Sequence, residues 1–168
     1  MNFKIKKKKK VLVTGGTGFI AGWIIKHLVE EGVTVHATVR DPADKQKIAH
    51  LVKLSENNPG EIILFKADLL ERGSFNAAAK GCNIVFHIAS PFLFKFNDPV
   101  KDLINPAFEG TKNVLEAVNV TDSVERVVLT SSCAAIYGDA DECEHAPNNT
   151  CLLYTSPSPR DQRGSREA

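Results

Sequence analysis

The chain reads Val11-Leu12-Val13-Thr14-Gly15-Gly16-Thr17-Gly18-Phe19-Ile20-Ala21 close to its amino end. The first four of these residues form a short apolar run, which is typical of a strand buried on both faces of a parallel sheet. After the glycines, Ile20, Ile24 and Leu28 recur at fourfold spacing, as expected for one face of a helix. Gly32 is the expected end of that helix. The stretch therefore predicts a strand, a glycine-rich turn and a helix.

The chain continues this alternation of β-rich and helical stretches to about residue 130. Such an order predicts an α/β fold, a doubly wound parallel sheet of the Rossmann type, truncated after about the fifth strand. The expected strands are residues 11–14, 33–39, 62–65, 83–88 and 127–130.

Three further helices are expected between these strands. One covers about 44–55 and buries Ile48, Leu51, Val52 and Leu54. A short helix extends to Ala79, with Ser74 as its N-cap. The last ends near Asn119 and is bent near Pro106, because a proline ring opposes an unbroken helix.

Composition divides the chain into three parts. Residues 1–9 form a basic tail, 10–138 the Rossmann domain, and 139–168 an irregular tail rich in Ser, Pro and Arg. From about residue 151 the string resembles translated adapter sequence from assembled transcripts. We therefore expect that this last segment is not native and that the protein continues elsewhere.

The composition also argues against several classes of function. A formal net charge of +1 gives no reason to expect a nucleic-acid partner. No apolar run is long enough for a membrane helix, and no signal peptide is recognisable, so a cytoplasmic protein is expected. Cys143, His145 and Cys151 fit no standard zinc spacing, so no metal site is expected.

The glycine-rich turn carries the strongest chemical signal. A phosphate can approach the backbone closely only where side chains are absent, and a helix N-terminus offers free N–H groups and a positive dipole end. Gly15 would allow the tight turn, Gly18 the close approach, and the small Ala21 the packing of helix on strand. A purely structural glycine turn is the alternative. The position between a strand and a helix favours a dinucleotide diphosphate.

The end of the second expected strand bears on the choice of cofactor. An acidic residue there would bind the 2′-hydroxyl of NAD, but Arg40 follows Val39 directly, with Lys45 and Lys47 beyond it. A guanidinium binds phosphate through paired hydrogen bonds, which favours NADP. Asp41 could take the acidic role, which keeps NAD as an alternative.

The ends of the later strands carry further candidates. Asp68 can accept a hydrogen bond from the adenine amino group, although an aspartate is also common in turns. Small residues after His87 would let the cofactor ribose lie against the chain, while His87 itself is expected to be a packed core histidine. Ser132 could hydrogen-bond a substrate carbonyl or alcohol, and a turn serine is an equal alternative.

Five segments together resemble the extended short-chain dehydrogenases/reductases, in particular the branch of dihydroflavonol 4-reductase and cinnamoyl-CoA reductase. The resemblance covers about residues 10–138. It implies NADP(H) bound across the carboxyl ends of the strands and hydride transfer to a carbonyl. The segments are TGGTGFIAGWIIKHLVEEG (14–32), VHATVRDP (35–42), KADL (66–69), GCNIVFHIASP (81–91) and VVLTSS (127–132).

The resemblance also implies which residues would act. The catalytic serine of the family falls on Ser132. The implied cofactor-binding residues are Thr14, Gly15, Thr17, Gly18, Phe19 and Ile20 at the phosphates, Arg40 and Lys47 at the 2′-phosphate, Asp68 and Leu69 at the adenine, and Ala89, Ser90, Pro91, Thr130 and Ser131 at the ribose and nicotinamide.

One feature of the family is missing. Its proton donor is a tyrosine followed four positions later by a lysine, which lowers the pKa of the tyrosine. Here Tyr137 is followed by Asp141 and Tyr154 by Ser158. The family would place the tyrosine about 35 residues beyond Ser132, and we therefore expect the chain as written to be inactive.

Three functional hypotheses remain. The favoured one is a fragment of an NADP(H)-dependent oxidoreductase that acts on a small-molecule carbonyl or alcohol. A second is an NAD(P)-dependent epimerase/dehydratase or a hydroxysteroid dehydrogenase, which share the extended fold. A third is a catalytically silent NADP-binding module. The sequence names neither the substrate nor the oligomeric state.

Overall fold

The structure is a computed structural model, and it describes residues 9–91 and 95–132 of the chain. Within these residues five strands form one parallel sheet in the order β3-β2-β1-β4-β5. The chain winds outward from β1 in one direction and then, from β4, in the other, which confirms the doubly wound Rossmann sheet. The strands are β1 (Lys10–Val13), β2 (Thr34–Val39), β3 (Glu61–Lys66), β4 (Ile84–His87) and β5 (Arg126–Leu129).

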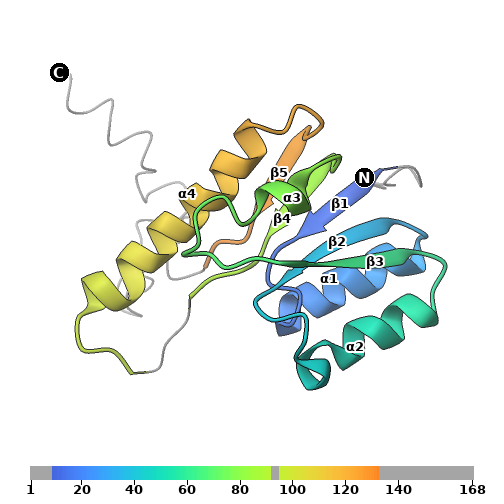
Figure 1. The fold of residues 1–168 in the computed structure, drawn as a ribbon, viewed down its shortest axis with the longest axis horizontal. Helices are drawn as coiled ribbons and strands as arrows, with labels where there is room; N and C mark the ends of the chain where they lie inside the picture. Colours follow the sequence, from blue (N-terminus) through green and yellow to red (C-terminus); the bar gives the residue numbers. More distant parts are fainter. Residues whose placement is uncertain (1–8, 92–94, 133–168) are drawn as a thin grey trace, which may run out of the picture. The chain divides into compact units, whose positions relative to one another are not determined.

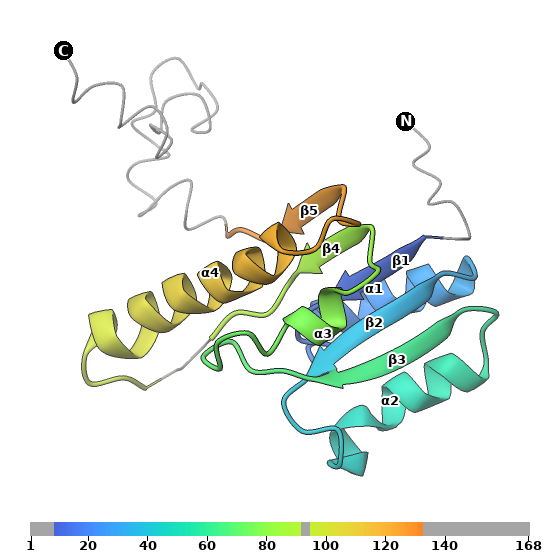
Figure 2. The same cartoon turned by 45° about the horizontal axis from the view of Figure 1, so that its top comes forward.

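Helices cover both faces of the sheet (Figures 1 and 2). On one face lie α1 (Phe19–Glu30) and α2 (Lys45–Glu56), and on the other α3 (Asn76–Ala79) and α4 (Asn105–Asn119). A five-residue π-helical turn, η1 (Val100–Ile104), precedes α4. No helix among the described residues is both long and apolar enough to cross a membrane.

Alternate residues of the central strands pack into two separate hydrophobic cores, one on each face of the sheet. Val11 and Val13 of β1 pack with α1 and α2, whereas Leu12 between them packs with α3 and α4. Both cores need apolar side chains, because successive residues of a strand point to opposite faces. This double burial explains why β1 reads as an unbroken apolar run.

The predicted buried faces of two helices need correction. Leu28 is buried as expected, but Ile20 is 55% exposed, and α1 buries Ala21, Ile25 and Val29 beside Leu28. Successive helical residues are about 100° apart, so the true stripe is turned by about one position from the predicted one. In α2, Ile48 and Leu51 are buried as expected, but Val52 is 43% exposed.

Two residues that were expected to shape helices, Ser74 and Pro106, have different surroundings in the structure. Ser74 does not cap α3, whose N-cap is Phe75. Instead, the Ser74 hydroxyl donates to the Asp68 carbonyl (2.8 Å) and accepts from the Asp68 N–H (3.2 Å). Pro106 lies in the first turn of α4, directly after η1, and the preceding Asn105 N–H donates to the Val100 carbonyl.

Several expectations fall outside the described residues. These concern the basic tail apart from Lys9, the irregular tail 139–168, the cysteine and histidine residues considered for zinc, and both tyrosines that lack a following lysine. Ser131 and Ser132 are described, but they follow the compact unit that ends at Thr130.

Candidate functional site

The carboxyl ends of the strands bring most of the predicted site residues to one edge of the sheet. Val13 pairs with Ala37 and Phe86, Val39 with Lys66, and His87 with Leu129. The residues that follow these strands therefore start side by side. Lys47 differs, because it lies in the first turn of α2. Open α/β sheets bind their ligands at this edge, where the strand order reverses.

The glycine-rich loop between β1 and α1 is fixed to the end of β2. The Gly15 N–H donates to the Thr38 hydroxyl (3.2 Å), and the Gly16 N–H donates to the Thr38 carbonyl (2.8 Å). Thr38 is not among the site residues expected from the sequence. The signal that could have identified it is a polar residue near the end of an otherwise apolar strand. Its two acceptors hold the loop in place.

Gly15 has no room for a side chain. Its φ of +72° lies in the left-handed region, which favours glycine. A Cβ atom at this position would lie 3.1 Å from the Ala89 Cβ atom. The loop can therefore approach the chain after β4 only because residue 15 is a glycine.

The N-terminus of α1 presents main chain to the solvent. Its N-cap, Gly18, is extended and provides no side-chain cap. Thr17, Gly18, Phe19 and Ile20 are all exposed. The first N–H groups of a helix have no partner within the helix, and the dipole makes this end positive. The loop and helix end thus fit the two negatively charged phosphates of a dinucleotide.

Thr14 joins the ends of β1 and β4. Its hydroxyl oxygen accepts from the N–H groups of Ile88 and Ala89, both at 3.0 Å. The hydroxyl proton is then directed to Nδ1 of His87, at 2.9 Å. This arrangement requires neutral His87 with its proton on Nε2.

The surroundings of His87 agree with that protonation state. The side chain is 2% exposed, and burial lowers its pKa from the ordinary value. The structure thus places His87 in the core, as the sequence indicated.

The exposed Arg40 directly follows β2 at the same edge. Asp41 is the acidic residue that kept NAD as an alternative cofactor. Its Oδ1 atom accepts from the Ala43 N–H (2.9 Å). Asp44 caps α2 by accepting from the Lys47 N–H (3.1 Å). Its other oxygen pairs with Lys47 Nζ at 2.9 Å, and these hydrogen bonds lower the pKa of Asp44. The exposed Lys47 ammonium keeps further N–H donors beside this ion pair, so its contact to a 2′-phosphate stays a prediction.

The loop after β3 begins beside Arg40. The Ala67 N–H donates to the Val39 carbonyl (3.0 Å), and Asp68 follows two residues after Lys66, the last paired residue of β3. Oδ1 of Asp68 accepts from the Leu70 N–H (2.9 Å). This contact is the turn role that the sequence left as an alternative. The carboxylate nevertheless lies at the same edge as Arg40.

The remaining predicted residues follow β4 and β5. Ala89 is held by Thr14, Ser90 is exposed, and Pro91 is half-buried. The Thr130 N–H donates to the His87 carbonyl at 3.0 Å. Ser131 and Ser132 are exposed, and they lie beyond the unit that contains the sheet.

Comparison with known proteins identifies relatives of this chain. It is 49% identical over 128 residues to "Anthocyanidin reductase" of Arabidopsis thaliana, which covers 76% of this chain and 37% of that protein. It is 51% identical over 126 residues to "Cinnamoyl-CoA reductase CAD2" of Medicago truncatula, covering 75% of this chain and 38% of that protein. The chain thus spans less than two-fifths of these relatives.

A solved structure and a family model extend the comparison. The crystal structure of Gre2 in complex with NADPH from Candida albicans matches with a TM-score of 0.67 and 29% identity. The match covers 95% of this chain and 53% of that one. The model of the NAD dependent epimerase/dehydratase family matches residues 11–161. The family model spans the strand–loop–helix unit and the sheet described above. The chain therefore belongs to the NAD dependent epimerase/dehydratase family.

Proposed function

We propose that this chain is the NADP(H)-binding part of a reductase that interconverts a small-molecule carbonyl and an alcohol. The observation that carries this proposal is the bare, uncapped phosphate loop with an exposed arginine at the neighbouring strand end. Support comes from relatives that are named reductases and from a similar structure described as an NADPH complex.

In this proposal, the residues that follow each strand bind a different part of the cofactor. The loop from Thr14 to Ile20 holds the diphosphate through main-chain N–H groups. Arg40 binds the 2′-phosphate, and Asp68 and Leu69 border the adenine. Ala89, Ser90 and Pro91, with Thr130 and Ser131, border the ribose and the nicotinamide. Bound NADPH would supply the hydride.

Ser132 is the proposed contact to the substrate. It follows β5 by three residues in the sequence, and its hydroxyl would donate a hydrogen bond to the carbonyl oxygen of the substrate. Such a donor polarises the carbonyl and stabilises the negative charge that develops on its oxygen.

Arg40 gives the choice of NADP over NAD its physical basis. A guanidinium forms paired hydrogen bonds to a phosphate and stays charged at any relevant pH. Of the nearby groups, Asp41 accepts from the Ala43 N–H through one oxygen, and the exposed Lys47 pairs with Asp44 and can add a second contact to the 2′-phosphate. Arg40 follows the end of β2 directly. Arg40 is therefore the residue on which we place the cofactor preference.

The test compares Arg40→Asp with Lys53→Asp. Both exchange an exposed cation for an anion, but Lys53 lies in the last turn of α2, away from the strand ends. Loss of charge-assisted hydrogen bonds predicts that Arg40→Asp weakens NADPH binding by roughly 10- to 100-fold. NADH binding should change much less, and Lys53→Asp should change neither. Fluorescence titration of the parent chain and of both variants measures the affinity for each cofactor.

Two results would contradict the proposal. Equal losses of NADPH and NADH in Arg40→Asp would remove Arg40 from the choice of cofactor. A parent chain that binds no nicotinamide nucleotide would overturn the proposed function as a whole.

A further inference from the structure

Asn113 on α4 is a buried polar residue that the cofactor contacts above leave unused. Its side chain is 5% exposed, and its amide nitrogen donates to the carbonyls of Leu69 (3.1 Å) and Glu71 (2.7 Å). Its amide oxygen accepts from the Gly73 N–H at 2.9 Å. One side chain thus binds three main-chain groups of a single loop, residues 68–74.

The same loop is held to α4 at two further points. A Cβ atom on Gly110 would lie 2.9 Å from the Leu69 Cβ atom, so α4 approaches the loop as closely as a glycine permits. Arg72 donates from Nε and from the guanidinium end to the two carboxylate oxygens of Glu116, both at 3.3 Å. Leu69 is therefore fixed from the helix side.

The loop is also closed on itself around Asp68. Ser74 binds both the N–H and the carbonyl of Asp68, and the Asp68 carboxylate accepts from the Leu70 N–H. The backbone at Asp68 and Leu69 consequently has little freedom to move without breaking bonds to Ser74 or Asn113. These two residues are the ones that border the adenine in the proposed function.

We propose that Asn113 is a positioning residue, which sets the adenine-binding loop through its three main-chain hydrogen bonds. This inference rests on the proposed function. Asn113 acts through Asp68 and Leu69 and does not touch the cofactor. Buried amide bonds suit this task, because an unpaired buried donor or acceptor is costly and the loop has one favoured position.

The choice of variants follows from the geometry. Asn113→Asp keeps the size of the side chain and an acceptor for the Gly73 N–H, but it cannot donate to the two carbonyls. Gly110→Ala leaves Asn113 intact and pushes Leu69 away by steric contact. Val114→Ala is the matched control, since Val114 is buried in the same helix but packs into the core instead.

The measurement pairs each variant with two cofactors, NADPH and its reduced hypoxanthine analogue, which carries an oxygen in place of the adenine amino group. The parent chain should prefer NADPH by about tenfold, the worth of a hydrogen bond from an amino group to a carboxylate. Asn113→Asp and Gly110→Ala should weaken NADPH binding and bring the preference close to one. Val114→Ala should lower the stability and leave the preference unchanged.

The outcomes separate this inference from the proposed function. A parent chain that binds neither cofactor overturns the proposed function. A parent chain that binds both equally well overturns only the inference. The same holds if Asn113→Asp and Gly110→Ala keep the parent preference. Should Asn113→Asp fail to fold, Gly110→Ala decides alone, because the three atoms nearest to its added Cβ atom all belong to the Leu69 side chain.

Discussion

At the residue scale, the Thr14 hydroxyl makes three contacts that define the edge of the site. It satisfies the N–H groups of Ile88 and Ala89 and holds His87 in one tautomer. Ala89 is also the residue that faces Gly15, so the hydroxyl fixes the chain that the phosphate loop approaches. A small side chain thereby couples two strand ends that lie far apart in the sequence.

We expect Thr14→Val to destabilise the chain. Valine has nearly the same shape, but it removes the acceptor of two part-buried N–H groups, and the loss of these hydrogen bonds should cost about 1–2 kcal/mol in total. Thr14→Ser keeps the hydroxyl and should cost much less. Urea unfolding followed by circular dichroism gives both free energies. Equal destabilisation by valine and serine would show that the methyl group, and not the hydroxyl, matters.

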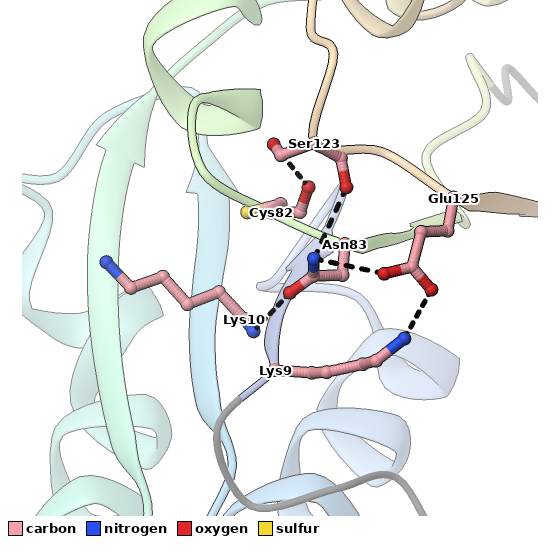
Figure 3. A network of polar contacts seen from close by, with 6 residues as sticks. All are labelled: Lys9, Lys10, Cys82, Asn83, Ser123 and Glu125. Atoms are coloured by element: carbon pink, nitrogen blue, oxygen red, sulfur yellow. Dashed lines mark hydrogen bonds and ion pairs between the residues drawn. The ribbon is translucent and has the colours of Figure 1, made fainter.

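At the scale of elements, a polar network joins the amino ends of three strands (Figure 3). Asn83, just before β4, accepts from the Lys10 N–H of β1 (3.3 Å) and donates to the Ser123 carbonyl (3.3 Å). Its amide also donates to Glu125 (3.4 Å), which pairs with Lys9. The network fixes β1, β4 and the segment before β5 at the edge opposite to the candidate site.

The Lys9 ammonium gives this network a dependence on pH. Its hydrogen bond to Glu125 holds the pKa of that carboxyl below its ordinary value. Glu125 therefore binds its proton more readily in the unfolded chain. The associated stability is present above the unfolded pKa and is lost as the pH falls through the lowered one.

We expect Asn83→Leu to lower the free energy of unfolding by about 1–2 kcal/mol, because it removes hydrogen bonds between separate strands. Asn57→Leu is a suitable comparison. The Asn57 side chain donates to the Lys53 carbonyl one turn back, at the end of α2 (2.7 Å), and its loss should have a smaller effect. Parallel urea titrations compare the two variants. A larger loss for Asn57→Leu would contradict the role given to the network.

At the scale of the whole molecule, two apolar cores lie on either side of the sheet. Cys82 reports on one of them, since its side chain is 0% exposed and packs with β1, α3 and α4. Burial raises the pKa of the Cys82 thiol to about 11. As the pH rises from the ordinary value towards 11, the unfolded chain loses this proton first, so stability falls over that range.

We expect iodoacetamide at about pH 8 to leave Cys82 unmodified in the folded chain, because only an exposed thiolate reacts readily. Labelling should rise with urea in parallel with the loss of circular dichroism. Mass spectrometry of the peptide that contains Cys82 separates it from the other cysteines. Rapid labelling without urea would contradict the burial of this core.

The sequence by itself determined the local parts of this protein. The apolar run, the glycines and the following helix predicted β1, the glycine-rich loop and α1, because strand and helix periodicities and a left-handed φ are properties of short segments. The alternation of such segments predicted a parallel sheet. The place of Arg40 directly after β2 likewise follows from counting along the chain.

Only the tertiary structure decided the contacts between distant segments. It showed that α1 buries Ala21 and exposes Ile20. It also showed that Ser74 binds the Asp68 main chain and does not cap a helix, and that Asn113 binds Leu69, 44 residues earlier in the chain. A polar side chain can satisfy its hydrogen bonds with many partners of equal chemistry. Which partner it binds depends on which main-chain groups the packed sheet and helices bring within reach.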